Sequence, residues 1–202
     1  MNAFSTTIQR LAVTPGTIGI VGAGAMGSGI AQIAAAAGNR VVLVDADSDA
    51  LTRSAAALQR VMARLVEKGR ETAAAADSLQ TRIQRTTEIA ALAPCDLVIE
   101  AIVERLDAKQ AVFSAVEQVV GSHTVLATNT SSLAVTAIAR VLQRPERCVG
   151  LHFFNPAPLM ALVEVIPALQ TEAGLAEACA DLMRFWGKSP ALAKDTPGFI
   201  VN

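Results

Sequence analysis

Aromatic residues are scarce in this sequence: they make up 3% of its 202 residues, and none of them is tyrosine. Tyrosine is therefore excluded as a catalytic acid, and the stacked aromatic platforms that bind single-stranded nucleic acids are not expected. The formal net charge is −1, and the lysines and arginines form no basic stripe. The chain thus lacks the electrostatic footprint of a nucleic-acid-binding protein.

Cysteines and long apolar runs are also few. Cys95, Cys148 and Cys179 are odd in number and widely spaced, which predicts neither a disulfide framework nor a metal site. Such thiols are typical of a reducing compartment, so we expect a cytoplasmic protein. No apolar run approaches the ~20 residues that cross a bilayer. Residues 1–16 contain one arginine and no acid, too little for a transit peptide, and we expect a disordered leader there.

Hydrophobic residues are plentiful, at 52% of the chain, and many of them are alanine. Short β-branched runs predict strands, and apolar residues at helical spacing predict helices between them. Strands are expected at 17–21, 41–45, 96–101, 124–127, 148–154 and 162–166, and helices at 25–37, 48–68, 71–85, 107–120, 133–142 and 172–186. This alternation predicts one α/β domain over residues 17–202, a Rossmann-type doubly wound and mostly parallel sheet with helices on both faces.

A glycine-rich turn joins the first expected strand to its helix. Gly22, Gly24 and Gly27 form a G-x-G-x-x-G pattern around Met26, which allows a tight turn, close approach of a pyrophosphate and a helix packed near its strand. Asp45 ends the next strand, where a carboxylate binds the adenosine ribose and repels a 2′-phosphate. The pattern favours NAD over NADP. The alternative is a helix-capping aspartate beside a turn that serves packing alone.

His152 and Glu164 are the candidates for acid–base chemistry. Glu164 interrupts an apolar run, where a carboxylate is costly to bury without a partner. A turn at residues 155–158 would fold the two flanking strands together and let Glu164 fix the tautomer of the imidazole, which then exchanges a proton with a substrate alcohol. Taken with its own neighbours alone, a histidine beside two phenylalanines is more often a core residue than a functional one.

Over residues 16–202 the sequence resembles a known family, the L-3-hydroxyacyl-CoA dehydrogenases. Five motifs in order carry the resemblance: Gly22-Ala-Gly-Ala-Met-Gly-Ser-Gly-Ile-Ala-Gln, Val98-Ile-Glu-Ala-Ile-Val-Glu, Thr128-Asn-Thr-Ser-Ser, Gly150-Leu-His-Phe-Phe-Asn-Pro-Ala-Pro-Leu-Met-Ala-Leu-Val-Glu-Val and Asp195-Thr-Pro-Gly-Phe-Ile-Val-Asn. The stretch from His152 to Glu164 is the most diagnostic. The resemblance implies an NAD-dependent enzyme that interconverts L-3-hydroxyacyl-CoA and 3-ketoacyl-CoA by hydride transfer.

The resemblance also implies residue roles. His152 is the expected acid/base and Glu164 its orienting partner, while Ser131 and Asn202 bind the substrate oxygen. The expected cofactor contacts are Gly22, Gly24, Met26, Gly27, Asp45, Glu104, Lys109 and Asn129, of which Glu104 and Lys109 contact the nicotinamide half. Lys68 is a candidate partner for a substrate phosphate. Without the family, Ser131 is a helix cap, Asn129 a turn residue, and Glu104 and Lys109 solvated helix charges.

Members of the family continue past the position of Asn202 into a helical domain that forms a homodimer and closes over the acyl chain. This sequence contains none of that domain, so we expect NAD binding with reduced turnover. Two other readings stay open: a related dehydrogenase for a free hydroxy acid or sugar acid, and a non-catalytic NAD-binding structural domain.

Overall fold

The computed structural model describes residues 3–201 and places eight strands in one sheet, in the order β3-β2-β1-β4-β5-β6-β7-β8. The strands are β1 Thr17–Val21, β2 Arg40–Val44, β3 Ile83–Thr86, β4 Leu97–Glu100, β5 Val125–Thr128, β6 Cys148–Phe153, β7 Leu162–Pro167 and β8 Ser189–Leu192. Neighbouring strands from β3 to β6 are parallel, and β7 turns back antiparallel to β6. The predicted Rossmann-type, mostly parallel sheet is confirmed.

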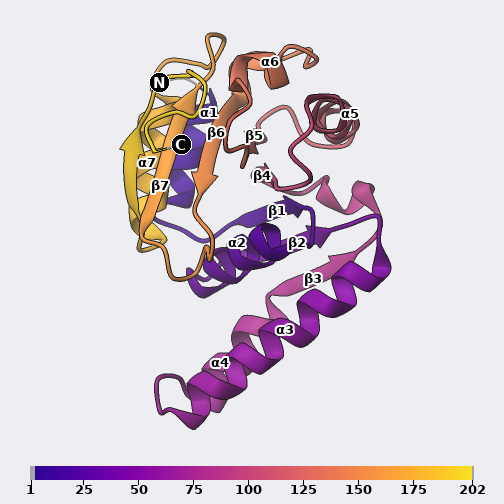
Figure 1. Cartoon of the computed structure of the whole chain (residues 1–202), viewed down its shortest axis with the longest axis vertical. Coiled ribbons are helices and arrows are strands. Elements are labelled where there is room, and N and C mark those ends of the chain that lie inside the picture. The colour runs from indigo at the N-terminus through magenta and orange to yellow at the C-terminus, as the bar shows by residue number, and fades with distance from the viewer. Residues whose placement is uncertain (1–2, 202) are drawn as a thin grey trace.

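Helices cover both faces of this sheet (Figure 1). They are α1 Ala3–Leu11, α2 Ala25–Ala36, α3 Ser48–Glu67, α4 Ala73–Thr81, α5 Leu106–Glu117, α6 Val135–Ala139 and α7 Leu175–Phe185, with short 3-10 turns η1 Ile89–Leu92 and η2 Pro145–Arg147. One hydrophobic cluster joins α1, α2, α3, α4 and α7 to one face, and a second joins η1, α5 and α6 to the other. Successive strand side chains alternate between the clusters: Val98 packs into the second and Ile99 into the first.

Because parallel strands share a direction, their carboxyl ends meet at one edge of the sheet. The loop after β1, the end of β4 and the turn after β5 all lie at that edge. The hairpin of β6 and β7 adds an antiparallel pair beside them. This edge is where ligands bind in open α/β sheets, and it carries the residues discussed below.

The expectation of a disordered leader over residues 1–16 is wrong for the part of it that the structure describes. α1 is amphipathic: Phe4, Ile8 and Leu11 recur at helical spacing and are buried against α7. Arg10 pairs with Asp96 and so ties the helix to the start of β4. Burial of three large apolar side chains outweighs the weak helix propensity of a short segment.

Three other elements differ most from prediction. The helix expected over 71–85 ends at Thr81, and the chain then forms the edge strand β3, which pairs with β2. The helix expected over 133–142 is only α6, whose first two amides, of Val135 and Thr136, donate to the carboxylate of Asp195. β8, with Pro190, was not predicted; proline is tolerated there because β8 is an edge strand. Each depends on non-local pairing, which local patterns do not encode.

Candidate functional site

The glycine loop has the shape that a dinucleotide phosphate needs. Gly22 has a φ of +105°, and a Cβ there would lie 2.7 Å from the carbonyl oxygen of Ala101. A Cβ on Gly27 would lie 1.8 Å from the carbonyl oxygen of Gly22, so the start of α2 sits against the loop. A Cβ on Gly24 would meet nothing within 4 Å. The loop is therefore tightly packed inside and open at Gly24, where the N-terminal amides of α2 offer partial positive charge to an anion.

Asp45 stands beside this loop. It follows the last residue of β2, and its Oδ2 accepts a hydrogen bond from the amide of Ala23 at 2.6 Å. Its Oδ1 accepts from the amide of Asp47 at 2.9 Å. The neighbouring Asp47, not Asp45, caps α3. The capping alternative therefore does not apply to Asp45, whose carboxylate stands at the end of β2, where the motif predicts a ribose contact.

His152 and Glu164 face one another across the β6–β7 hairpin as register partners. The Nδ1 of His152 lies 2.7 Å from Oε2 of Glu164, with the two side chains 6% and 0% exposed. An ionised carboxylate only accepts, so Nδ1 carries the proton that faces it, and in the neutral imidazole Nε2 then keeps its lone pair. The predicted meeting of the two residues is confirmed in geometry; their catalytic role stays a prediction.

The surroundings of the pair hold both side chains in place. Oε1 of Glu164 accepts hydrogen bonds from the amides of Ile200 at 3.0 Å and Val201 at 3.1 Å. Two phenylalanine rings lie near the imidazole of His152, with centroids 4.4 Å away for Phe154 and 5.8 Å for Phe199. Asn202, expected to bind the substrate oxygen, lies outside the described residues.

Glu104 organises the turn that follows β5. Its Oε1 accepts from the hydroxyl of Thr130 at 2.6 Å and from the amide of Ser131 at 2.7 Å, and the Ser131 hydroxyl lies 3.1 Å away. Burial alone raises the pKa of Glu104, but these hydrogen bonds and the charge of Lys109 outweigh it and lower the pKa to about 2. Glu104 is therefore a fixed anion that orients Ser131, not a solvated helix charge.

Lys109 is likewise not solvated. Its side chain is 1% exposed, and its Nζ lies 2.7 Å from Oε1 of Glu100 and 3.2 Å from Oε2 of Glu104. Sequence reasoning gave no role to Glu100, although it ends an apolar strand as Glu164 interrupts one. The same argument about a costly buried carboxylate would have found it.

Two further expected cofactor residues have clear positions. Asn129 follows β5, and its Oδ1 accepts from the amide of Phe153 at 2.9 Å, which ties the carboxyl ends of β5 and β6 together. Met26 is half-buried in the first turn of α2 and packs on the main core cluster. Asn129 thus links two strand ends in addition to lying in a turn, and Met26 lies beside the glycine loop, at the start of α2.

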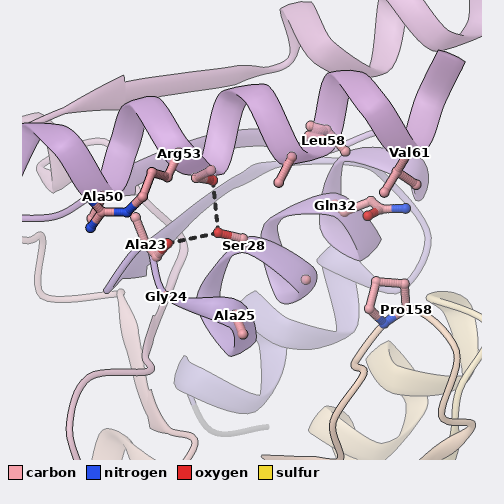
Figure 2. Close-up of a pocket in the computed structure, with 13 residues that line it drawn as sticks. Ala23, Gly24, Ala25, Ser28, Gln32, Ala50, Arg53, Leu58, Val61 and Pro158 are labelled. Carbon is pink, nitrogen blue, oxygen red and sulfur yellow. Dashed lines mark hydrogen bonds between the residues drawn. The ribbon is translucent and has the colours of Figure 1, made fainter.

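A cavity of about 380 Å³ lies between α2 and α3 (Figure 2). Gly24, Ser28 and Gln32 line one wall, Arg53 and Val61 the other, and Pro158 of the hairpin loop closes one end. Within the wall, the Ser28 hydroxyl lies 2.9 Å from the carbonyl oxygen of Ala23 and 2.8 Å from Oγ of Ser54.

Lys68 is not brought to this cavity. It caps the far end of α3, about 10 Å of helix beyond the lining residue Val61. The basic side chain in the wall is instead that of Arg53, which pairs with Asp47 at 3.1 Å and was missed from the sequence. The signal that could have identified Arg53 was an arginine near the start of the helix that follows β2.

Comparisons with known proteins agree with this geometry. Residues 17–196 match the family described as "3-hydroxyacyl-CoA dehydrogenase, NAD binding domain". The 3-hydroxyadipyl-CoA dehydrogenase of Escherichia coli K12 is 46% identical over 186 residues, which are 92% of this chain and 39% of that protein. The human mitochondrial hydroxyacyl-coenzyme A dehydrogenase is 42% identical over 189 residues, 91% of this chain and 60% of that protein.

Solved structures give the same result. A crystal structure of 3-hydroxybutyryl-CoA dehydrogenase from Escherichia coli K12 superposes with a TM-score of 0.91 at 44% identity, covering 94% of this chain and 40% of that one. The (S)-3-hydroxybutyryl-CoA dehydrogenase from Ralstonia eutropha superposes at 0.89 with 42% identity, covering 92% and 66%. The chain therefore spans 39% to 66% of the length of these relatives.

Proposed function

Since the chain belongs to the 3-hydroxyacyl-CoA dehydrogenase family, as its NAD-binding domain, we propose that the protein interconverts L-3-hydroxyacyl-CoA and 3-ketoacyl-CoA with NAD as cofactor. The observation that carries the proposal is the buried His152–Glu164 pair near the carboxyl end of β6, at the same edge of the sheet as an open glycine loop. A dinucleotide bound at that loop supplies the acceptor for a hydride. A non-catalytic domain would have no need of a buried, oriented imidazole.

The chain's own residues supply the proton chemistry. Nε2 of His152 takes the proton of the substrate alcohol, because Nδ1 is already protonated toward Glu164. The ionised Glu164 stabilises the imidazolium that forms. We assign Ser131, which Glu104 holds, and Asn202 to the same substrate oxygen.

We further propose that the cavity between α2 and α3 receives the nucleotide end of the CoA. Arg53 lines it and is exposed, so its guanidinium can exchange Asp47 for a phosphate. Gly24 and Ser28 bring this cavity close to the glycine loop, so the cofactor and thioester sites adjoin. Lys68 is a weaker candidate because α3 carries it away from the cavity.

The test is a substrate series. Acetoacetyl-CoA, longer 3-ketoacyl-CoA thioesters and free acetoacetate would be reduced with NADH, with NADPH as the control, at high protein concentration. The proposal predicts oxidation of NADH by thioesters, none by the free acid, and little with NADPH because of Asp45. Faster turnover of free acids would place the protein among the related dehydrogenases instead.

The cellular setting is also part of the proposal. We place the protein in the cytoplasm and in fatty-acid β-oxidation, as a homodimer when a helical second domain is present. The three cysteines support a reducing compartment: all are free and buried, and burial raises the pKa of each thiol to about 12. Among residues 3–201, every helix is too short or too polar to cross a bilayer.

A further inference from the structure

A buried group of charges at the end of β4 includes one residue that the proposed function does not use. Glu100 is 2% exposed, and both of its carboxylate oxygens are engaged. Oε1 accepts from Nζ of Lys109 and from the amide of Ile102, each at 2.7 Å, and Oε2 accepts from the hydroxyl of Thr128 at 2.7 Å. Each donor is itself fixed by the backbone of β4, β5 or α5. Glu100 is thus held rigidly.

The charges in this group do not cancel. Lys109 contributes one ammonium, whereas Glu100 and Glu104 contribute two carboxylates, so the formal charge is −1. Lys109 already has one acidic partner in Glu104, so neutralising a buried lysine does not require Glu100. Because the pKa of Glu104 is lowered to about 2, Glu104 carries its negative charge at neutral pH. Two carboxylates held around one ammonium attract a bound group of positive charge.

NAD⁺ supplies such a group, since its nicotinamide ring is cationic and the ring of NADH is neutral. We propose that Glu100 is a positioning residue that fixes Lys109 and Glu104 and gives the nicotinamide end of the site the net negative charge that favours NAD⁺ over NADH. This inference rests on the proposed function, because it takes Glu104 and Lys109 to face the nicotinamide half of the cofactor.

The measurable consequence is a ratio of affinities. Removing one negative charge weakens the attraction for the cationic ring and leaves the neutral ring nearly unaffected. At the effective dielectric of about 20 that applies near protein sites, one unit charge about 12 Å away changes an affinity by about tenfold, and a closer one changes it by more. The ratio Kd(NAD⁺)/Kd(NADH) should therefore rise by about tenfold or more in Glu100→Gln. A residue that only supports the fold would weaken both forms alike.

Calorimetric titration of NAD⁺ and NADH into the parent chain, Glu100→Gln and Glu67→Gln provides the test. Glu67 is an exposed acid at the end of α3, and its variant should keep the parent ratio. The double variant Glu100→Gln/Lys109→Met restores a formal charge of −1 and should return the ratio toward that of the parent. This reversal separates charge from damage, because structural damage would grow in the double variant.

The outcomes are distinct. A raised ratio in Glu100→Gln that falls back in the double variant supports the inference, and an unchanged ratio, or equal weakening of both forms, overturns it. If Glu100→Gln does not fold, Glu104→Gln removes one unit of charge from a side chain that is 36% exposed, and it should raise the ratio in the same direction. A parent chain that binds neither nucleotide overturns the cofactor assignment and this inference with it.

Discussion

Replacing Glu164 by glutamine should move the proton of the His152 ring from Nδ1 to Nε2. In the parent, Oε2 of Glu164 faces Nδ1, and Oε1 accepts from the amides of Ile200 and Val201. Those two amides can only donate, so the single oxygen of a glutamine must stay with them. Its NH₂ group then faces Nδ1, which has to become an acceptor. Nε2 would carry the proton and could no longer accept one from an alcohol.

The structure also sets the energetic scale of this change. A hydrogen bond to a charged group contributes about 1.5–3 kcal/mol and a neutral one about 0.5–1.5 kcal/mol. Glu164→Gln keeps a neutral bond and should therefore cost only about 1 kcal/mol of folding free energy. Glu164→Leu leaves the buried Nδ1–H without an acceptor and should cost about 1–3 kcal/mol more, while water can reach the exposed Ile200 and Val201.

Nitrogen NMR of histidine-labelled protein reads the tautomer directly. The chain has two histidines, so His123, which is exposed, provides an internal reference in the same spectrum. The parent should show a protonated Nδ1 at His152, and Glu164→Gln a protonated Nε2. Glu177→Gln, an exposed acid on α7, serves as the matched control. An unchanged His152 tautomer in Glu164→Gln, or a protonated Nε2 in the neutral parent, would refute the reasoning.

Three further predictions concern the glycine loop, the helix α1 and the carboxylate of Glu104. Gly24→Ala should leave thermal stability unchanged, because the added methyl group meets nothing within 4 Å. The same methyl group should weaken NADH binding about tenfold or more, because it fills the space that the phosphates need. Gly27→Ala should lose stability as well, because its Cβ would lie 1.8 Å from the carbonyl oxygen of Gly22. Calorimetry and melting curves of both variants check this, and equal melting temperatures for the two would contradict it. Ile8→Ala should destabilise the chain by about 2–4 kcal/mol in urea unfolding, since Ile8 is fully buried; a change below 0.5 kcal/mol would mean that α1 is not docked. For Glu104, a folded pKa of about 2 lies below the ordinary 4.5, so its contribution to stability is present above about pH 4.5 and is lost as the pH falls toward 2. Acid titration of unfolding should therefore show the difference between the parent and Glu104→Gln shrinking over that window, and a constant difference would count against it.

The parts of the fold that local patterns encode were predictable. The strands β1, β2, β4, β5 and β6 are short apolar runs, and the turn between β6 and β7 brings His152 opposite Glu164. The pairing of a buried histidine with a buried carboxylate follows from the cost of leaving either alone. The site could therefore be located from sequence wherever its residues share a hairpin or follow a strand.

Features that depend on distant partners were not predictable in this way. α1 is ordered because α7 offers an apolar surface from the other end of the chain. β3 forms because β2 needs an edge partner, although the residues before it favour a helix. Lys109 has the spacing of an exposed helix residue, and only the convergence of β4, β5 and α5 places it inside with Glu100.

The most direct test of the proposed function is a single-turnover experiment with the protein in excess. NADH is mixed with acetoacetyl-CoA, and the rate of NADH oxidation in the parent is compared with that in His152→Gln. The account predicts oxidation by the parent and a loss of about 10²–10⁴-fold in the variant, the usual contribution of a positioned acid–base group. Equal rates in the two proteins, or bound NADH that the parent never oxidises, would contradict it.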